Sequence, residues 1–414
     1  MESSPLIDRS EYGFGRDARA DFPAFERLER DRPLAFFDGP GGSQVPTQVI
    51  EAVSRYYRRS NANTHGAFCT SVETDAVIEK ARESCAALLC APGPETISFG
   101  ANMTTLTFSL AHALGRTLRP GDEILITQLD HEANRGPWLN LRQAGIQVRE
   151  VRMTLQGELD YEDFGAKLNE ATRIVAVGWA SNALGTVNDL SWIREQTRRV
   201  GARLVVDAVH YAPHFGINVQ TADFDFLLCS AYKFYGPHIG ILYSRPNLLG
   251  QLPTDRLIAQ DSRAPWRIET GTLNHAGLAG VTAAIEYLAS WGKDGDLRSR
   301  LEQAFPRLGR HESSLARRLW NGLGHIEAVR RYGPDFDETS RAPTVAFRVR
   351  HLSPRTVAKR LAEEGVLVWD GDFYAARAIE ILGLASLGGV VRAGISLYTT
   401  EQDVDRLLAV VERL

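Results

Sequence analysis

The sequence is poor in lysine, cysteine and long apolar stretches. The last two shortages argue against particular classes of protein. No apolar run approaches the length of a membrane span and the N-terminus has no apolar export segment, so we expect a cytoplasmic protein without a membrane partner. The cysteines follow no metal-ligand spacing, which predicts no metal site and core thiols at Cys85, Cys90 and Cys229. The net charge of −4 indicates no nucleic-acid partner. No G-x-G-x-x-G or GK(S/T) motif follows a predicted strand, which argues against a nucleotide-binding protein.

Lysine is so scarce that the position of a single lysine is informative. Four of the five lysines, Lys80, Lys167, Lys293 and Lys359, lie in charged helical or turn sequence. Lys233 instead follows an apolar run and lies among aromatic residues. Burial there would lower the pKa of its amine and make it nucleophilic. On this stretch alone, a lysine that reaches from a strand end to water is an equally good interpretation.

Strands and helices alternate between residues 96 and 243. The predicted strands are Thr96–Phe99, Glu123–Thr127, Gln147–Val151, Ile174–Trp179, Leu204–Asp207, Phe226–Cys229 and Ile239–Tyr243. Such nearly continuous apolar strands, separated by helices, predict a mostly parallel sheet with helices on both faces. The fold class is therefore α/β, with a large domain built on a sheet of the seven-stranded type and a smaller α+β C-terminal domain.

The chain divides into three expected parts. Residues 1–30 form an N-terminal segment that packs with the small domain, residues 31–292 form the large domain, and residues 293–414 form the small domain. A short amphipathic helix is predicted over residues 21–31 and another helix over residues 134–143. A long helix is predicted over Val72–Leu89, with Val72, Ala76, Ile78, Ala81, Cys85 and Leu88–Leu89 facing inward.

Polar residues follow the carboxyl ends of several predicted strands, which is where open α/β sheets bind ligands. These residues are His131, Asn182, Asp207, His210, Ser230 and Lys233, together with the segment GANMTT at 100–105, which opens a helix. A lysine, a buried carboxylate, an imidazole and a helix N-terminus are the parts that a pyridoxal phosphate site needs. Each residue alone could serve an ordinary structural purpose, but their recurrence at successive strand ends is hard to explain by packing.

Several motifs resemble those of one family. SAYKFYGPHIGILY, VVDAVHYAPH and LDHEANRGPW resemble the lysine, aspartate and histidine motifs of the class V aminotransferase superfamily, whose members are fold-type I pyridoxal phosphate enzymes. Within it, the sequence is similar to the cysteine desulfurase-like branch, from FFDGPGGS to VRAGISLYTTEQDVDRL. The resemblance implies pyridoxal 5′-phosphate as the cofactor.

The resemblance also implies a role for each residue that contacts the cofactor ring. Lys233 forms the Schiff base, Asp207 pairs with the pyridine nitrogen, and His131 stacks on the ring. Asn182 lies near the phenolic oxygen or the substrate carboxylate. His210 stands where desulfurases usually carry a glutamine that reaches the phenolic oxygen.

The same resemblance implies which residues bind the cofactor phosphate and the substrate. The implied phosphate-binding residues are Asn102, Met103, Thr104, Ser230 and Tyr232. Thr272 is expected to reach the phosphate of a partner subunit and His65 to face the partner's site, which implies a homodimer with shared active sites. Arg392 is expected to hold the α-carboxylate of a small amino-acid substrate, because arginine forms a two-pronged contact with carboxylates.

The stretch from 369 to 389 departs from the desulfurase pattern. Desulfurases carry their sulfur-accepting cysteine there, whereas this sequence has none, and Tyr374 stands at the matching position. Tyr374 could act as an acid, as a wall for the substrate, or simply as a packed loop aromatic. Cys69 is the nearest thiol by sequence context, and no motif supports it as an acceptor.

The expected function is that of a pyridoxal phosphate enzyme acting on a free amino acid through a Lys233 Schiff base and a quinonoid carbanion. The leading interpretation is a cysteine desulfurase-like C–S lyase without a persulfide cysteine. An aminotransferase or an epimerase of the same family is the first alternative. A non-catalytic binding protein that retains the fold is the alternative of a different class.

Overall fold

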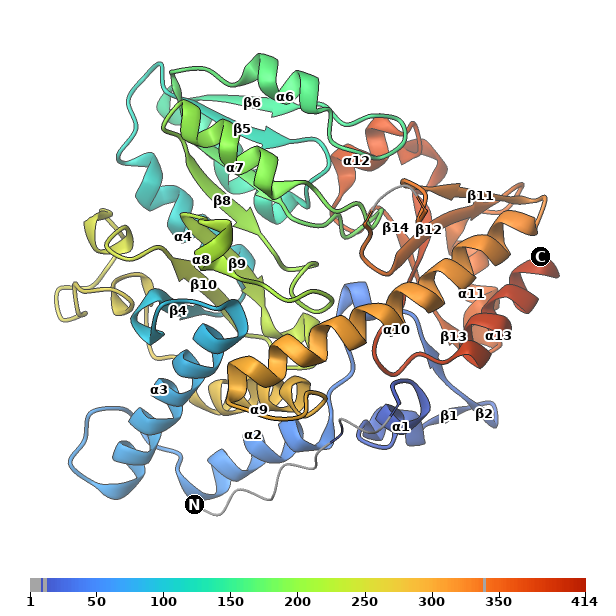
Figure 1. The fold of residues 1–414 in the computed structure, drawn as a ribbon, viewed down its shortest axis with the longest axis horizontal. Coiled ribbons are helices and arrows are strands. Elements are labelled where there is room, and N and C mark those ends of the chain that lie inside the picture. The colour runs from blue at the N-terminus through green and yellow to red at the C-terminus, as the bar shows by residue number, and fades with distance from the viewer. Residues whose placement is uncertain (1–8, 10–12, 338–339) are drawn as a thin grey trace.

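Seven strands form the central sheet of the computed structural model, which describes residues 9, 13–337 and 340–414 (Figure 1). In sheet order they are β4 (Ile97–Gly100), β10 (Gly240–Ser244), β9 (Phe226–Ser230), β8 (Arg203–Asp207), β7 (Thr172–Gly178), β5 (Glu123–Thr127) and β6 (Gln147–Val151). The strands from β9 to β6 pair in parallel, and β10 is antiparallel to both of its neighbours. The predicted mostly parallel sheet is therefore confirmed, with β10 as its reversed strand.

Helices cover both faces of this sheet because its strands are apolar on both faces. In β8, Leu204 and Val206 join a core shared with α3 (Cys69–Leu89), α7 (Leu190–Arg199) and α9 (His275–Ala289). Val205, between them, joins the opposite core with α4 (Met103–Gly115) and α5 (Gly136–Leu139). This alternation follows from the two-residue period of a strand.

A second sheet lies on the other side of the molecule from β4 and β10 (Figure 1). Its antiparallel strands, in order, are β11 (Val329–Tyr332), β12 (Thr344–Val349), β15 (Val390–Gly394) and β14 (Trp369–Gly371). Its core includes residues of α10 (Leu297–His325), α11 (Pro354–Glu363) and α13 (Glu401–Glu412). The remaining helices and strands are α1 (Arg16–Arg19), α2 (Thr47–Arg59), α6 (Tyr161–Lys167), α8 (Val219–Ala222), α12 (Ala376–Ile381), β1 (Leu28–Glu29), β2 (Arg32–Pro33), β3 (Ala35–Phe36) and β13 (Val366–Leu367).

The N-terminal part of the chain contacts the C-terminal part. Strand β3 pairs in parallel with β13. Arg19 donates a hydrogen bond of 2.9 Å to the carbonyl oxygen of Tyr398 and forms an ion pair with Asp403. The division at residues 30 and 292 stays a prediction, and the part of it that concerns residues 1–8 and 10–12 lies outside the described residues.

Some predictions of local structure were wrong. Residues 21–31 form a 3₁₀ turn at Pro23–Glu26 and the strand β1, because Arg30 and Asp31 take the left-handed conformation that joins β1 to β2. The helix expected over 134–143 is broken into a 3₁₀ turn, the four-residue α5 and a second 3₁₀ turn.

The first half of α3 also differs from the prediction. Val72 and Ala76 are exposed, whereas Ser71 and Thr74 are buried. The reason is that this part of the helix is anchored by polar contacts, in which the Thr74 hydroxyl donates to the carbonyl oxygen of Ser60, rather than by the apolar core. In the second half, the predicted inward residues Ala81, Cys85, Leu88 and Leu89 are buried.

Two of the three expected core thiols are in the core. Cys85 and Cys229 are buried. Cys90 is only partly buried, because it is the left-handed residue that ends α3 at the surface.

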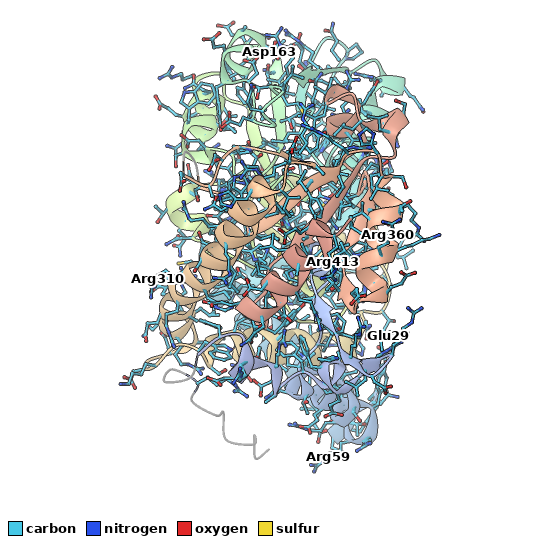
Figure 2. The ribbon with its side chains drawn as sticks, turned by 90° about the vertical axis from the view of Figure 1, so that its right-hand side faces the viewer. Glu29, Arg59, Asp163, Arg310, Arg360 and Arg413 are labelled. Atoms are coloured by element: carbon cyan, nitrogen blue, oxygen red, sulfur yellow. The ribbon has the colours of Figure 1, made fainter. Side chains whose placement is uncertain are left out.

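Arginine provides much of the surface charge, and Figure 2 shows Arg59, Arg310 and Arg360 at the outline of the molecule. Within the described residues, no helix combines the length and hydropathy needed to cross a membrane. The same residues contain no group of three or more His, Cys, Asp and Glu side chains that could hold a metal ion.

Candidate active site

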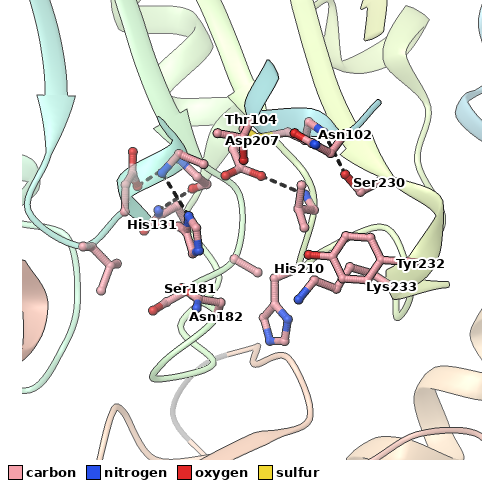
Figure 3. Close-up of a pocket in the computed structure, with 18 residues that line it drawn as sticks. Asn102, Thr104, His131, Ser181, Asn182, Asp207, His210, Ser230, Tyr232 and Lys233 are labelled. Atoms are coloured by element: carbon pink, nitrogen blue, oxygen red, sulfur yellow. Dashed lines mark hydrogen bonds between the residues drawn. The ribbon is translucent and has the colours of Figure 1, made fainter. Parts of the chain in front are cut away.

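A pocket opens where the central strands end (Figure 3). It encloses about 660 Å³ of empty space, part of it open to solvent. Ten of its lining residues are those predicted from strand ends and motifs: Asn102, Met103, Thr104, His131, Asn182, Asp207, His210, Ser230, Tyr232 and Lys233. The pocket combines them because the parallel strands all present their carboxyl ends at one edge of the sheet.

Lys233 lies in the 3₁₀ turn that follows β9, and its side chain enters the pocket. Its Nζ donates to the carbonyl oxygen of Pro40 and lies 4.8 Å from the ring centroid of Tyr232. Loss of hydration in the pocket, together with the positive charge of Arg392, lowers the pKa of the Lys233 amine to about 7, and the charge of Asp207 offsets this only in part. An amine with this pKa is in large part unprotonated at neutral pH.

Asp207 is the last residue of β8 and is almost completely buried. One carboxylate oxygen accepts a hydrogen bond of 2.9 Å from the backbone N–H of Val209. Burial raises the pKa of Asp207 to about 7, and the neighbouring carboxyl of Asp130 raises it in the same direction. A positively charged group in the pocket would stabilise the carboxylate form.

His131 is held in one tautomer. Its Nδ1 accepts a hydrogen bond of 3.0 Å from the backbone N–H of Ala133, which places the proton of the neutral ring on Nε2. Burial, with the charges of Lys233 and Arg392, lowers the pKa of His131 to about 4. The ring is therefore neutral at pH 7.

Sequence reasoning missed Asp130, which lines the pocket beside His131. Its two carboxylate oxygens accept hydrogen bonds from the Thr127 hydroxyl at 2.8 Å, the Gly178 N–H at 2.9 Å and the Asn134 side-chain amide at 2.9 Å. It thus joins the ends of β5 and β7. Its place directly before His131 in LDHEAN was the available signal, but aspartate is common in loops, where it usually caps a turn or faces water.

One end of the pocket suits an anion. Helix α4 begins there, with Asn102 as its cap, and the backbone N–H of Met103 donates to the Ser230 hydroxyl oxygen at 2.9 Å. Because Ser230 accepts this bond, its own O–H remains free to donate to a ligand. Gly240 permits the close packing, since an added Cβ would collide with the backbone of Asn102.

Arg392 lies behind the pocket rather than in its lining. It is 3% exposed, its Nη1 donates to the carbonyl oxygen of Asn182 at 2.9 Å, and its Cζ lies 4.0 Å from the ring centroid of Phe373. Burial lowers the pKa of Arg392 to about 9. Within the described residues, Arg392 Nε and Asn182 Oδ1 are buried without a hydrogen-bond partner, which indicates capacity for a further ligand.

Besides Arg392, three predicted site residues lie outside the pocket lining. Tyr374 is 72% exposed, with its ring centroid 5.6 Å from that of His131. The side chain of His65 is exposed and pairs with Asp75 at 3.2 Å, and Thr272 is also exposed. No cysteine is among the described residues that line the pocket, and Cys69 lies exposed at the start of α3.

The sequence model for class V aminotransferases matches residues 35–407. The chain belongs to the class V aminotransferase family. Members of this family use pyridoxal phosphate.

Curated relatives within the family are cysteine desulfurases. The chain is 32% identical over 412 residues to the cysteine desulfurase of Pectobacterium carotovorum subsp. carotovorum (strain PC1), covering 96% of this chain and 97% of that protein. Among solved structures, the Escherichia coli cysteine desulfurase CsdA is 29% identical with a TM-score of 0.83, covering 96% of this chain and 97% of that one. The apo cysteine desulfurase of Thermococcus onnurineus NA1 is 28% identical with a TM-score of 0.85, covering 100% and 99%.

Proposed function

We propose that this protein is a pyridoxal phosphate enzyme that acts on a free amino acid, with desulfurase-like C–S lyase chemistry and without a persulfide cysteine. The observation that carries the proposal is the amine of Lys233, whose pKa is lowered to about 7 in a pocket that it shares with Asp207 and His131. A lysine serving only as surface charge would not need such burial.

The residues present fit the cofactor. The N-terminus of α4 and the Ser230 hydroxyl suit a phosphate group, and the buried Asp207 carboxyl suits a protonated ring nitrogen. When bound, pyridoxal phosphate supplies an aldehyde that Lys233 can condense with and a ring that accepts electrons from the substrate. Binding a cation beside Asp207 would also lower the raised pKa of this carboxyl.

Lys233 and His131 can perform the proton chemistry. An amine with a pKa near 7 can take a proton from the substrate Cα and return it, since both of its forms are populated at neutral pH. His131 is neutral and presents Nε2 as a donor, so it can cover a ring without adding charge.

The substrate side of the pocket supports loss of a β-substituent without transfer to a protein thiol. The stretch from 369 to 389 has no cysteine, and the ring of Tyr374 lies beside that of His131. The curated relatives are named cysteine desulfurases, which favours a sulfur-containing amino acid as the substrate. Arg392 is the group proposed to hold the α-carboxylate.

We further propose a homodimer in which His65 and Thr272 serve the partner's site. Both side chains are exposed and lie outside the pocket of their own chain, so in a monomer neither has a role in it. Mixing chains that carry His65→Ala with chains that carry Lys233→Ala should restore part of the activity, because one of the two sites in such a dimer would have both residues.

One experiment tests the central proposal. Purified protein is incubated with pyridoxal phosphate, reduced with borohydride, digested and analysed by mass spectrometry, with Lys80→Ala as a matched lysine control. We expect the reduced cofactor on the peptide that contains Lys233 in both wild type and control. Failure to trap it there would contradict the proposal.

The reaction is then identified with a panel of amino acids, in which sulfide, pyruvate, ammonia and keto acids are measured. Sulfide release from a sulfur-containing amino acid without a protein-bound persulfide is expected. A keto acid formed with transfer of the amino group would instead indicate an aminotransferase, and racemisation alone would indicate an epimerase.

A further inference from the structure

His210 makes a buried hydrogen bond that joins the two sheets. It lines the pocket from the loop after β8, and its Nε2 lies 3.0 Å from the hydroxyl oxygen of Thr344, the first residue of β12. His210 is 3% exposed and Thr344 is fully buried. Figure 3 shows the ring of His210 beside the side chain of Lys233.

The chemistry of the two groups decides which one donates. A buried hydroxyl needs an acceptor for its proton, and within the described residues His210 Nε2 is the hydrogen-bond partner of the Thr344 hydroxyl. Thr344 therefore donates to Nε2. A neutral imidazole that accepts at Nε2 carries its proton on Nδ1.

The ring of His210 is neutral. Burial, together with His214 and the charges of Arg392 and Lys233, holds the pKa of His210 well below its ordinary value. The carboxyl of Glu312 hydrogen-bonds to His214 rather than to His210, at 2.8 Å, and so provides His210 with no direct ionic partner.

Thr344 is held in place by the segment that precedes it. The backbone N–H of Ala342 donates to the carbonyl oxygen of Gly185 at 2.9 Å. Arg341 Nη2 donates to the carbonyl oxygens of Leu184 at 2.6 Å and of Thr344 at 3.0 Å. These bonds attach the start of β12 to the loop after β7, so the Thr344 hydroxyl has a fixed position beside His210.

The ring of His210 has a second contact. The ring of His214 packs edge-on against it at 5.4 Å between centroids. His214 is itself anchored by its bond to Glu312 on α10. The contacts with Thr344 and His214 together restrict rotation of the His210 ring.

We propose that Thr344 is a positioning residue, whose hydroxyl fixes His210 in the Nδ1–H tautomer so that this N–H is offered to the phenolic oxygen of the cofactor. The inference rests on the proposed function for the identity of the ligand. A glutamine in place of His210 would carry its donor on a defined atom, whereas a histidine can place its proton on either ring nitrogen. The hydroxyl of Thr344 removes that ambiguity.

The first test reads the tautomer directly in the cofactor-free protein. Protein labelled with ¹⁵N-histidine is studied by NMR, and the His210 signals are assigned with His210→Gln. We expect the Nδ1–H tautomer in wild type and in Thr344→Ser, which keeps the hydroxyl. In Thr344→Val, which keeps the branched shape, the proton should redistribute toward Nε2. An unchanged tautomer in Thr344→Val would overturn the proposal.

The second test uses the visible absorption band of the protein with pyridoxal phosphate bound. Loss of one hydrogen bond to the phenolic oxygen should move the pH midpoint of this band by about one unit in Thr344→Val, with Thr344→Ser close to wild type. Introducing Thr344→Val into His210→Gln should have no further effect, because the hydroxyl acts through the histidine. If Thr344→Val shifts the pH midpoint equally in wild type and in His210→Gln, this role of Thr344 is contradicted.

A matched control separates positioning from general loss of packing. Thr197 is also fully buried, and its hydroxyl donates to the carbonyl oxygen of Arg194 on α7. Thr197→Val should leave both the His210 tautomer and the absorption band unchanged. If wild type forms no visible band at all, the proposed function fails, while the NMR result still decides the role of Thr344.

Discussion

The two walls of the pocket are built in different ways. The wall from the central sheet carries Lys233, Asp207 and His131 at strand ends. Asp207 and His131 are fixed by backbone N–H groups within their own motifs, whereas the amine of Lys233 donates to the carbonyl oxygen of Pro40.

The second wall is formed by Asn182, which lines the pocket and contacts Arg392 and Phe373 behind the lining, so its contacts join segments far apart in the sequence. The first wall carries the residues of the lysine, aspartate and histidine motifs, and the stretch from 369 to 389 beside the second wall contains no cysteine. Under the proposed function, cofactor binding and choice of reaction belong to separate parts of the structure.

The largest expected effect tests the first wall at Lys233. Lys233→Ala should lower turnover by at least about a thousandfold, because it removes both the attachment point and the base. Steady-state rates and the visible spectrum would be compared with those of Lys80→Ala. Turnover retained within tenfold would show that another group performs the chemistry.

Asp207→Asn should weaken binding of pyridoxal phosphate by about 10- to 100-fold, since it removes a charged partner for the ring nitrogen. Without the cofactor, the same substitution should instead change how the stability of the folded protein depends on pH. The pKa of Asp207 is raised to about 7 in the folded protein, so the native state binds more protons than the unfolded state between about pH 4 and 7, and stability falls as pH rises through this window.

Thermal unfolding of the cofactor-free protein at pH 5 and pH 8 measures this second effect. Asp207→Asn should lose less stability than wild type between the two values, since asparagine does not titrate. Equal losses would mean that Asp207 is not the group that titrates.

The second wall is tested next at Arg392. Arg392→Gln should raise KM for carboxylated substrates by about 10- to 100-fold with a smaller change in kcat, because a charge-assisted contact to the carboxylate is lost. The corresponding amine without a carboxylate is the control substrate, and its KM should not change. The variant should also raise the pKa of Lys233, since the positive charge of Arg392 lowers it.

The smallest effect is expected at Tyr374. Its ring is largely exposed, so Tyr374→Phe should reduce kcat by less than about tenfold. A loss of a hundredfold or more, with a changed pH profile, would instead assign the hydroxyl a role as a general acid. That outcome would place part of the chemistry on the second wall.

Sequence reasoning predicted the structure correctly where an element depends on a local pattern of residues. The strand before His131 and the strand that ends at Asp207 were predicted because their apolar runs are continuous, and the sheet topology then brought the strand ends together. It failed at Val72, where helical periodicity could not show that this turn of α3 lies outside the apolar core. It also missed Asp130, whose role depends on hydrogen bonds to residues on two strands.

The sequence by itself determined the family, and it predicted the residues that the central sheet brings to the pocket, because these are carried by short motifs at strand ends. Only the tertiary structure decided that Arg392 lies behind Phe373, that Tyr374 is exposed beside His131, and that Thr344 hydrogen-bonds to His210. The physical reason is that these contacts join residues that are far apart in the chain, so no local pattern records them. The second wall is specified by packing between the two sheets.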